Sequence, residues 1–141
     1  MAVNPRSPAT GEMSWFCCGS SWGPCGSAGG GACGNCDSGS HQCAWPYASS
    51  ACFQVTRPDL CGLNLTQRSC GHVFSVTNLC NSKSVSVSIA DCGPATSSFC
   101  GEQSCCGGTC ASNRLIDLTP SAFSAIGSLS SGLLPAQVVS P

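Results

Sequence analysis

Residues 73–94, which read VFSVTNLCNSKSVSVSIADCGP, carry the clearest fold signal in the chain. The run Val73–Thr77 is rich in β-branched and aromatic residues, and Ser84–Ile89 alternates between serine and an aliphatic residue. Turn-forming residues dominate Asn78–Lys83 between them. The pattern predicts a β-hairpin with one buried face. The residues expected to point inward from its second strand are Val85, Val87 and Ile89.

Further regular elements are predicted toward the C-terminus. Leu115–Leu118 reads as a strand, and Thr119 is a suitable N-cap for a helix with Pro120 at its first position. A short apolar stripe follows, and Gly127 is expected to end the helix. Residues 132–139 (GLLPAQVV) then predict a turn into a closing strand.

The first half of the chain is poorer in regular patterns. Residues 14–61 are rich in Gly, Ser and Cys and have few apolar runs, so we expect disulfides rather than a core to hold them. Short strands are predicted at residues 13–16 and at Ala51–Thr56. We expect residues 1–13 to be a flexible or engineered N-terminal segment and residues 14–141 to form a single domain.

The cysteine content indicates that the protein works in an oxidising compartment. The chain has 15 cysteines in 141 residues, about 11%, above the ~8–10% at which a short chain reads as a disulfide scaffold. An odd number leaves one thiol free, paired to another chain, or partnered outside this sequence. Most of the following are expected to be bridged: Cys17, Cys18, Cys25, Cys33, Cys36, Cys43, Cys52, Cys61, Cys70, Cys80, Cys92, Cys100, Cys105, Cys106 and Cys110.

Zinc is the competing interpretation of closely spaced cysteines such as Cys33 and Cys36. A structural zinc site uses only four ligands, which would leave most of the cysteines unexplained. We therefore expect no metal and no cofactor. The insertion at residues 95–110, rich in Gly, Ser and Cys, is expected to be ordered by disulfides.

Charge and hydropathy exclude several partners. Charged residues make up 8% of the chain and the net charge is −1, so nucleic acid is not an expected partner. No apolar run approaches the ~18 residues of a transmembrane helix, so we expect no membrane partner. Residues 1–11 are polar and lack the apolar region of a signal peptide, so we interpret the chain as a mature secreted domain behind a processed or engineered start.

A family resemblance rests on three segments, VTNLCNSKSVSVSIADCGP at 76–94, RLIDLTPSAFSAIG at 114–127 and LLPAQVV at 133–139. Their order resembles the double-psi β-barrels of expansins and rare-lipoprotein-A-like proteins, in the barwin-like superfamily. GGGACGNC at 29–36 is similar to a segment near the start of those domains. The resemblance implies a mainly β fold: a six-stranded double-psi β-barrel with one or two short helices and long disulfide-stapled loops.

The resemblance also implies a groove lined by two acidic residues, in which expansins bind extended polysaccharide and catalytic members cleave glycan strands. The matching positions here are Asp91 and Asp117. Glycoside cleavage needs a protonated acid and usually a second carboxylate, which a shared groove would supply. Each Asp also has a structural interpretation, because Asp91 suits a turn and Asp117 lies two residues before a helix N-cap.

Two departures from the enzymes of this superfamily argue against catalysis. Family 45 glycoside hydrolases carry an Asp before their vicinal cysteine pair, where this chain has Phe16. Lytic rare-lipoprotein-A members carry a His at the position that aligns with Gln67. His72 lies nearby and is a candidate substitute, since its ordinary pKa suits acid–base work near neutral pH.

Aromatic side chains are candidates for stacking on sugar rings. They fall in the first half of the chain, where either a groove or a small core around the disulfides would accommodate them. The candidate substrate-binding residues are Trp15, Trp22, Trp45 and Tyr47.

These features lead us to expect a secreted, extracellular expansin-like domain that binds cell-wall or other polysaccharide of the cellulose, chitin or peptidoglycan type without efficient hydrolysis. A lytic transglycosylase acting through Asp117 with Asp91 or His72 is one alternative. A protein-interaction module, such as a protease inhibitor or defence protein, is another. An assembly linked through the odd cysteine is the last.

Overall fold

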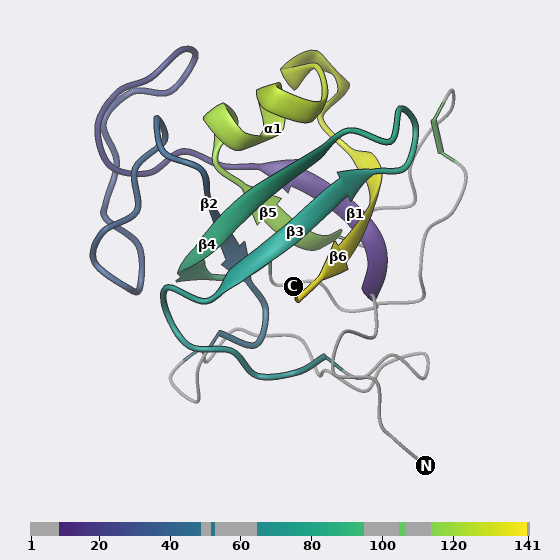
Figure 1. The fold of residues 1–141 in the computed structure, drawn as a ribbon. Coiled ribbons are helices and arrows are strands. Elements are labelled where there is room, and N and C mark those ends of the chain that lie inside the picture. Colours follow the sequence, from purple (N-terminus) through teal and green to yellow (C-terminus); the bar gives the residue numbers. More distant parts are fainter. Residues whose placement is uncertain (1–8, 49–51, 53–64, 95–104, 107–113, 141) are drawn as a thin grey trace.

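Six strands close into a barrel in the order β1-β5-β2-β4-β3-β6 (Figure 1). The computed structural model describes residues 9–48, 52, 65–94, 105–106 and 114–140. Its elements are β1 (Ala9–Trp15), β2 (Gln42–Trp45), β3 (Val73–Asn78), β4 (Ser84–Cys92), β5 (Arg114–Leu118), α1 (Pro120–Ile126), the 3-10 turn η2 (Leu129–Ser131) and β6 (Leu134–Val139). The expected mainly β, six-stranded barrel is confirmed.

Two of the pairings are parallel and join segments that are distant in the sequence. β1 lies parallel to β5, and β2 lies parallel to β4. The remaining neighbours are antiparallel, and β6 closes the barrel between β1 and β3. Ribbons from the beginning and the end of the chain therefore lie side by side (Figure 1).

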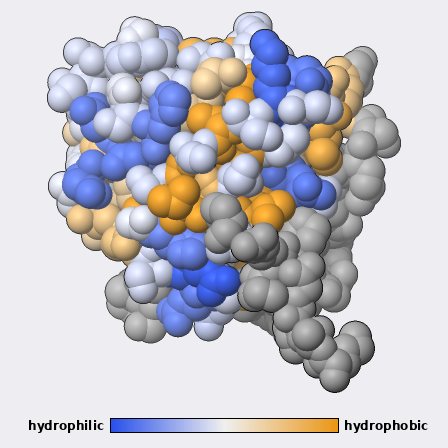
Figure 2. Space-filling view, in the orientation of Figure 1, coloured by the Kyte–Doolittle hydropathy of each residue, from blue (hydrophilic) through white to orange (hydrophobic). Residues whose placement is uncertain are grey.

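The hairpin predicted in residues 73–94 is β3 and β4, paired in antiparallel register. Val85, Val87 and Ile89 are at most 8% exposed, so the predicted inward face is confirmed. The serines between them face outward, and Ser84 and Ser86 are exposed. Figure 2 views the molecule from the same side as Figure 1, and residues of intermediate hydropathy lie among apolar ones near the centre of that face.

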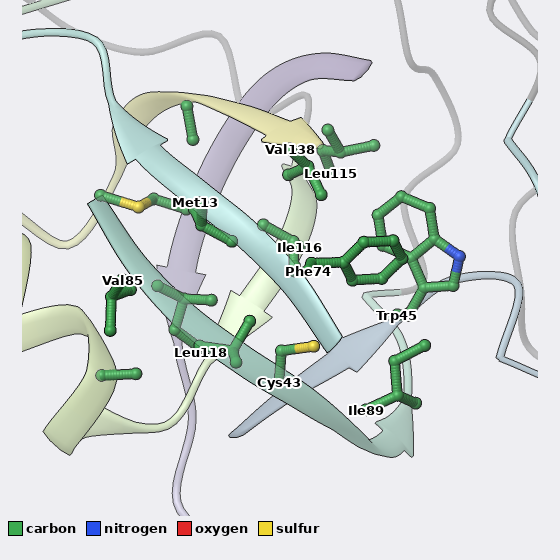
Figure 3. Close-up of a cluster of buried hydrophobic side chains, with 14 of the residues drawn as sticks. Met13, Cys43, Trp45, Phe74, Val85, Ile89, Leu115, Ile116, Leu118 and Val138 are labelled. Atoms are coloured by element: carbon green, nitrogen blue, oxygen red, sulfur yellow. The ribbon is translucent and has the colours of Figure 1, made fainter. Parts of the chain in front are cut away.

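The interior of the barrel is packed with apolar side chains from all six strands and from α1 (Figure 3). Trp45 belongs to this core, because it is 2% exposed and its ring centroid lies 4.5 Å from that of Phe74. Its indole Nε1 donates a hydrogen bond to the carbonyl oxygen of Thr66 at 3.1 Å. The prediction that Trp45 stacks on substrate was therefore wrong. The first half of the chain contributes to the core after all.

The strands of the first half differ from the expected ones. β1 begins at Ala9, upstream of the predicted start at residue 13, because its first residues pair with β6. β2 was not anticipated, since QCAW at 42–45 is short and has no alternating pattern. The strand predicted at Ala51–Thr56 lies outside the described residues, apart from Cys52. The division into residues 1–13 and 14–141 remains a prediction.

The predicted helix is confirmed as α1, with Pro120 at its start and Gly127 after its end. Thr119 occupies the N-cap position, but its side chain makes no capping hydrogen bond. Instead, Thr119 Oγ1 donates to the carbonyl oxygen of Ser40 at 2.5 Å and accepts from the backbone N–H of Gln42 at 3.1 Å. Thr119 thus attaches the start of the helix to β2.

Five disulfides join described cysteines: Cys17–Cys25, Cys18–Cys36, Cys33–Cys70, Cys52–Cys92 and Cys80–Cys106. Both cysteines of the zinc-like pair, Cys33 and Cys36, are thus bridged. Across the described ranges, no group of three or more His, Cys, Asp or Glu side chains is arranged to hold a metal ion. None of the helices in those ranges has the length and apolarity needed to cross a bilayer.

Cys43 is the free cysteine among the described residues. It is 0% exposed, on β2, with its side chain inside the barrel (Figure 3). Burial raises the pKa of its thiol far above the ordinary value, and the negative charge of Asp117 adds to the effect. A link between chains through Cys43 would require the barrel to open.

Candidate functional site

The two predicted carboxylates lie on the same side of the barrel wall, one strand to either side of Ala44. Ala44 of β2 is in register with Asp91 of β4 and with Asp117 of β5. Ser14 of β1 is in register with Asp117 in turn. Registered residues on neighbouring strands share a face, and strands lie about 4.8 Å apart. The Cα atoms of the two aspartates are therefore separated by roughly 10 Å.

We call the four residues Ser14, Asp117, Ala44 and Asp91 the carboxylate row. Side chains next to the row, including those of Met13, Cys43 and Leu118, point into the core. On three of its strands the row therefore faces away from the core, although Ser14 and Ala44 are themselves buried, at 7% and 2% exposed.

A register irregularity lies just before each aspartate. Between β2 and β4 it falls between the pairs Cys43↔Ile89 and Ala44↔Asp91, so one residue of β4 is extra. Without that bulge, Asp91 would share the inward phase of Ile89. The β1–β5 pairing shifts in the same way ahead of Asp117. Bulges re-aim side chains, and here they bring both carboxylates to one face.

Asp117 is largely buried, with a side chain 13% exposed. Ser14 Oγ donates a hydrogen bond to Asp117 Oδ1, and Arg114 Nη1 lies 3.9 Å from the same oxygen. Burial raises the pKa of Asp117 above its ordinary value, and the Ser14 hydrogen bond and the charge of Arg114 oppose this. The negative charge of Asp91 raises it further. Asp117 thus keeps its proton to a higher pH than an exposed aspartate.

Asp91 supports the loop that crosses this end of β4. Its Oδ1 accepts hydrogen bonds from the backbone N–H groups of Ala32 and Cys92, both at 2.8 Å. Cys33 adds a backbone hydrogen bond to Ala90 at 3.2 Å and a disulfide to Cys70. The turn-supporting interpretation of Asp91 therefore fits its contacts, and the residue remains partly exposed at the end of the row.

His72 lies on a different side of the barrel wall. It precedes β3 in the same phase as Phe74, and the two rings meet edge to face with centroids 5.0 Å apart. Its Nε2 is 2.9 Å from Ser140 Oγ. Burial, with a contribution from the charge of Arg68, lowers the pKa of His72. The structure does not bring His72 into the carboxylate row, which removes support for it as the second group of a lytic enzyme.

The three remaining aromatic candidates are dispersed. Trp15 is half-buried against the core, and its Nε1 donates to the carbonyl oxygen of Leu129 at 3.0 Å. Tyr47, just after β2, is also half-buried against the core. Trp22 is partly exposed on the loop before β2, where its backbone pairs with Cys25. No described contact joins these aromatic rings to the carboxylate row.

Sequence reasoning missed two polar members of the site. Arg114 could have been found, because it lies three residues before Asp117 and a strand with a bulge brings it to the same carboxylate. Ser14 carries no local signal, since only the parallel pairing of β1 with β5 places it beside Asp117.

Comparisons with solved structures identify the fold class. No family model and no curated protein matches the sequence. An expansin of Clavibacter michiganensis, solved as a mutant in complex with cellohexaose, matches with a TM-score of 0.58 and 17% identity. The apo form of Clavibacter michiganensis expansin matches at 0.56 and 18%. Both alignments cover 96% of this chain and 50% of the expansin, so the chain spans about half the expansin length.

A Streptomyces papain inhibitor also matches, with a TM-score of 0.53 and 17% identity, over 96% of both chains. The described residues thus form an expansin-like double-psi β-barrel, as the sequence predicts. A similar barrel is found in an expansin solved with cellohexaose and in a papain inhibitor. The fold alone therefore does not distinguish carbohydrate binding from protease inhibition.

Proposed function

We propose that the chain is a secreted polysaccharide-binding domain that holds a glycan along the carboxylate row without hydrolysing it. The observation that carries this proposal is the placement of Asp91 and Asp117 on one face, two strands apart and flanking the small Ala44. The expansin that shares the fold binds cellohexaose, which supports a similar class of ligand for this chain.

The chemistry of the row suits hydrogen bonding to sugar hydroxyls. Asp117 is shielded and held by Ser14, so it presents a fixed oxygen rather than a mobile charge. Asp91 Oδ1 already accepts two backbone hydrogen bonds, which fixes the carboxylate against the loop and leaves Oδ2 as the oxygen that would accept from a ligand. Hydrolysis would need a second group free to activate water, and His72 is not within this row.

Composition supports a neutral ligand in an oxidising compartment. Charged residues make up 8% of the chain, so the surface offers little electrostatic attraction for a polyanion. The disulfides among described residues favour secretion, because such bridges persist in extracellular compartments.

Depletion from solution by insoluble cellulose, chitin and peptidoglycan tests the proposal. We expect one of these to retain the wild-type protein, and Asp117→Ala to lower the retained fraction about tenfold. Ser86→Ala, on the exposed face of β4, is the matched control and should bind as wild type.

Mass spectrometry of the supernatant completes this test. The proposal requires an absence of soluble sugar fragments. Anhydro-sugars or new reducing ends that disappear in Asp117→Ala would instead establish a glycan-cleaving enzyme. Wild-type protein that stays in solution with all three glycans would contradict polysaccharide binding.

A protease inhibitor is the second candidate, and a specific observation favours it. A Streptomyces papain inhibitor shares the fold of this chain, with a TM-score of 0.53. Disulfides in the loops before β2 also favour a preorganised contact surface, since rigid loops lower the entropic cost of binding. Inhibition of papain by the purified chain at micromolar concentration is the direct test.

A further inference from the structure

Residues 17–36, here called the stapled loop, form an extended excursion between β1 and β2 (Figure 1). It projects from the side of the barrel as the purple-to-blue trace. The loop contains no charged residue. The exposed residues around its tip are Ser20, Ser21, Gly23, Pro24, Gly26 and Ser27.

The stapled loop is held rigidly in spite of its Gly and Ser content. Cys17–Cys25 and Cys18–Cys36 tie its two sides, and Cys33–Cys70 attaches its end to the barrel. Backbone hydrogen bonds in both directions join its two sides near the base, at Gly19. The loop is therefore ordered before it meets any partner.

The tip is a tight hairpin. Trp22 and Cys25 exchange backbone hydrogen bonds of 2.9 and 2.8 Å around Gly23 and Pro24. Gly23 has φ +52°, a conformation that glycine adopts without strain. The Trp22 ring packs over Gly39, where an added Cβ would lie 3.0 Å from Trp22 Cδ1. The contact of the Trp22 ring with Gly39 thus supports the hairpin tip.

We propose that the stapled loop is the segment that enters the substrate cleft of an endopeptidase, an inference that rests on the protease-inhibitor function proposed above. The tip is a narrow hairpin whose exposed side chains are small and uncharged, so it can enter a cleft without steric or electrostatic obstruction. A tip fixed in advance loses little entropy on binding. The partner is a cysteine endopeptidase of the papain type, as named for the Streptomyces inhibitor that shares the fold.

The disulfide across the tip gives the loop a second property. Hydrolysis of one peptide bond between Cys18 and Cys25 breaks a C–N bond and adds water, with hydroxyl to the carbonyl carbon and a proton to the amine. Cys17–Cys25 would keep both new ends attached. The product would stay in the cleft, and the reverse reaction, which expels the same water, would compete with release. A substrate-like loop then behaves as an inhibitor.

Titration of papain with wild type, Pro24→Arg and Ser86→Arg tests the assignment. A large charged side chain at the tip should weaken inhibition at least about tenfold, whereas the same change on the exposed face of β4 should leave it unchanged. Equal melting temperatures for the three proteins confirm that each is folded. Unchanged inhibition by Pro24→Arg overturns the loop assignment and leaves the inhibitor function standing. A wild-type chain that does not inhibit papain overturns both.

Intact-mass analysis after long incubation with papain provides a second readout. The expected product is heavier than the starting chain by one water and separates into two pieces only after reduction. Sequencing should place the cut between Cys18 and Cys25. A cut outside the stapled loop, with inhibition retained, would overturn the assignment.

Discussion

Gly31 packs directly against Asp91. An added Cβ at Gly31 would lie 3.0 Å from Asp91 Cγ and 2.8 Å from the carbonyl oxygen of Ala90, and Gly31 has φ +74°. The loop can therefore cross β4 closely enough for Ala32 to donate its backbone N–H to Asp91 only because residue 31 has no side chain.

Gly31→Ala is expected to destabilise the protein by about 1–3 kcal/mol, because it combines a steric clash with a strained φ. Gly29→Ala is the matched control, since nothing lies within 4 Å of its added Cβ. Urea denaturation of both variants measures the difference. Equal stabilities would show that the loop can move away from β4 at no cost.

Asp117→Asn is expected to change how stability depends on pH. The pKa of Asp117 is raised in the folded state, so the folded protein binds this proton more tightly than the unfolded chain. Wild-type stability should therefore fall as pH rises from the unfolded to the folded pKa, and Asn should remove that loss. Melting temperatures of the two proteins should converge in acid and favour the variant near neutral pH.

The opposite result has a clear meaning for the Asp117→Asn experiment. A variant less stable than wild type at neutral pH would show that the ionised carboxylate, with Ser14 and Arg114, is net stabilising. Asp37→Asn, at an aspartate on the loop before β2, controls for the general effect of removing one negative charge.

Ser14→Ala is expected to raise the pKa of Asp117 further, because the Ser14 hydroxyl donates to the carboxylate and favours its charged form. NMR titration of the Asp117 carboxyl carbon measures this directly. Ser14→Thr retains the hydroxyl and should return the pKa toward the wild-type value. A pKa that stays the same or falls in Ser14→Ala would contradict the role assigned to this hydrogen bond.

Cys43 is expected to resist thiol reagents in the folded protein. It is 0% exposed and its thiol pKa is raised, and both features suppress the reactive thiolate. Labelling with a maleimide, with and without denaturant, followed by peptide mapping, measures its accessibility. Rapid native-state labelling at Cys43 would show that the barrel opens readily.

Cys43→Ser, which buries a hydroxyl in place of sulfur, should lower the free energy of unfolding by about 1–3 kcal/mol.

The second half of the fold could be predicted because its signals are local. Alternation in Ser84–Ile89 specifies one buried face, and Thr119, Pro120 and Gly127 mark the ends of a helix. These patterns need no knowledge of distant partners. β2 could not be found in this way, because its four residues become a strand only through pairing with β4 and β5.

The two carboxylates of the candidate site were predictable from the sequence, but their geometry and their contacts with Ser14 and Arg114 were not. Asp91 and Asp117 follow from the family-like motifs, yet alternation alone would point Asp91 inward with Ile89. The bulges that turn both carboxylates outward depend on pairing between distant strands. Trp45 was expected to bind substrate because it lies in a segment rich in Gly and Cys. It fills the core instead, because residues 42–45 of that segment form a strand of the barrel.

The sealed position of Cys43 has a consequence for how the correct bridges are selected. While the chain is still opening and closing, this thiol is available to attack any wrongly formed disulfide and so keeps the pairings exchanging. Once β2 is enclosed between β4 and β5, the same sulfur is withdrawn and exchange through it stops. Closure of the barrel would thus end disulfide exchange through Cys43, because this thiol is accessible only while the barrel is still open.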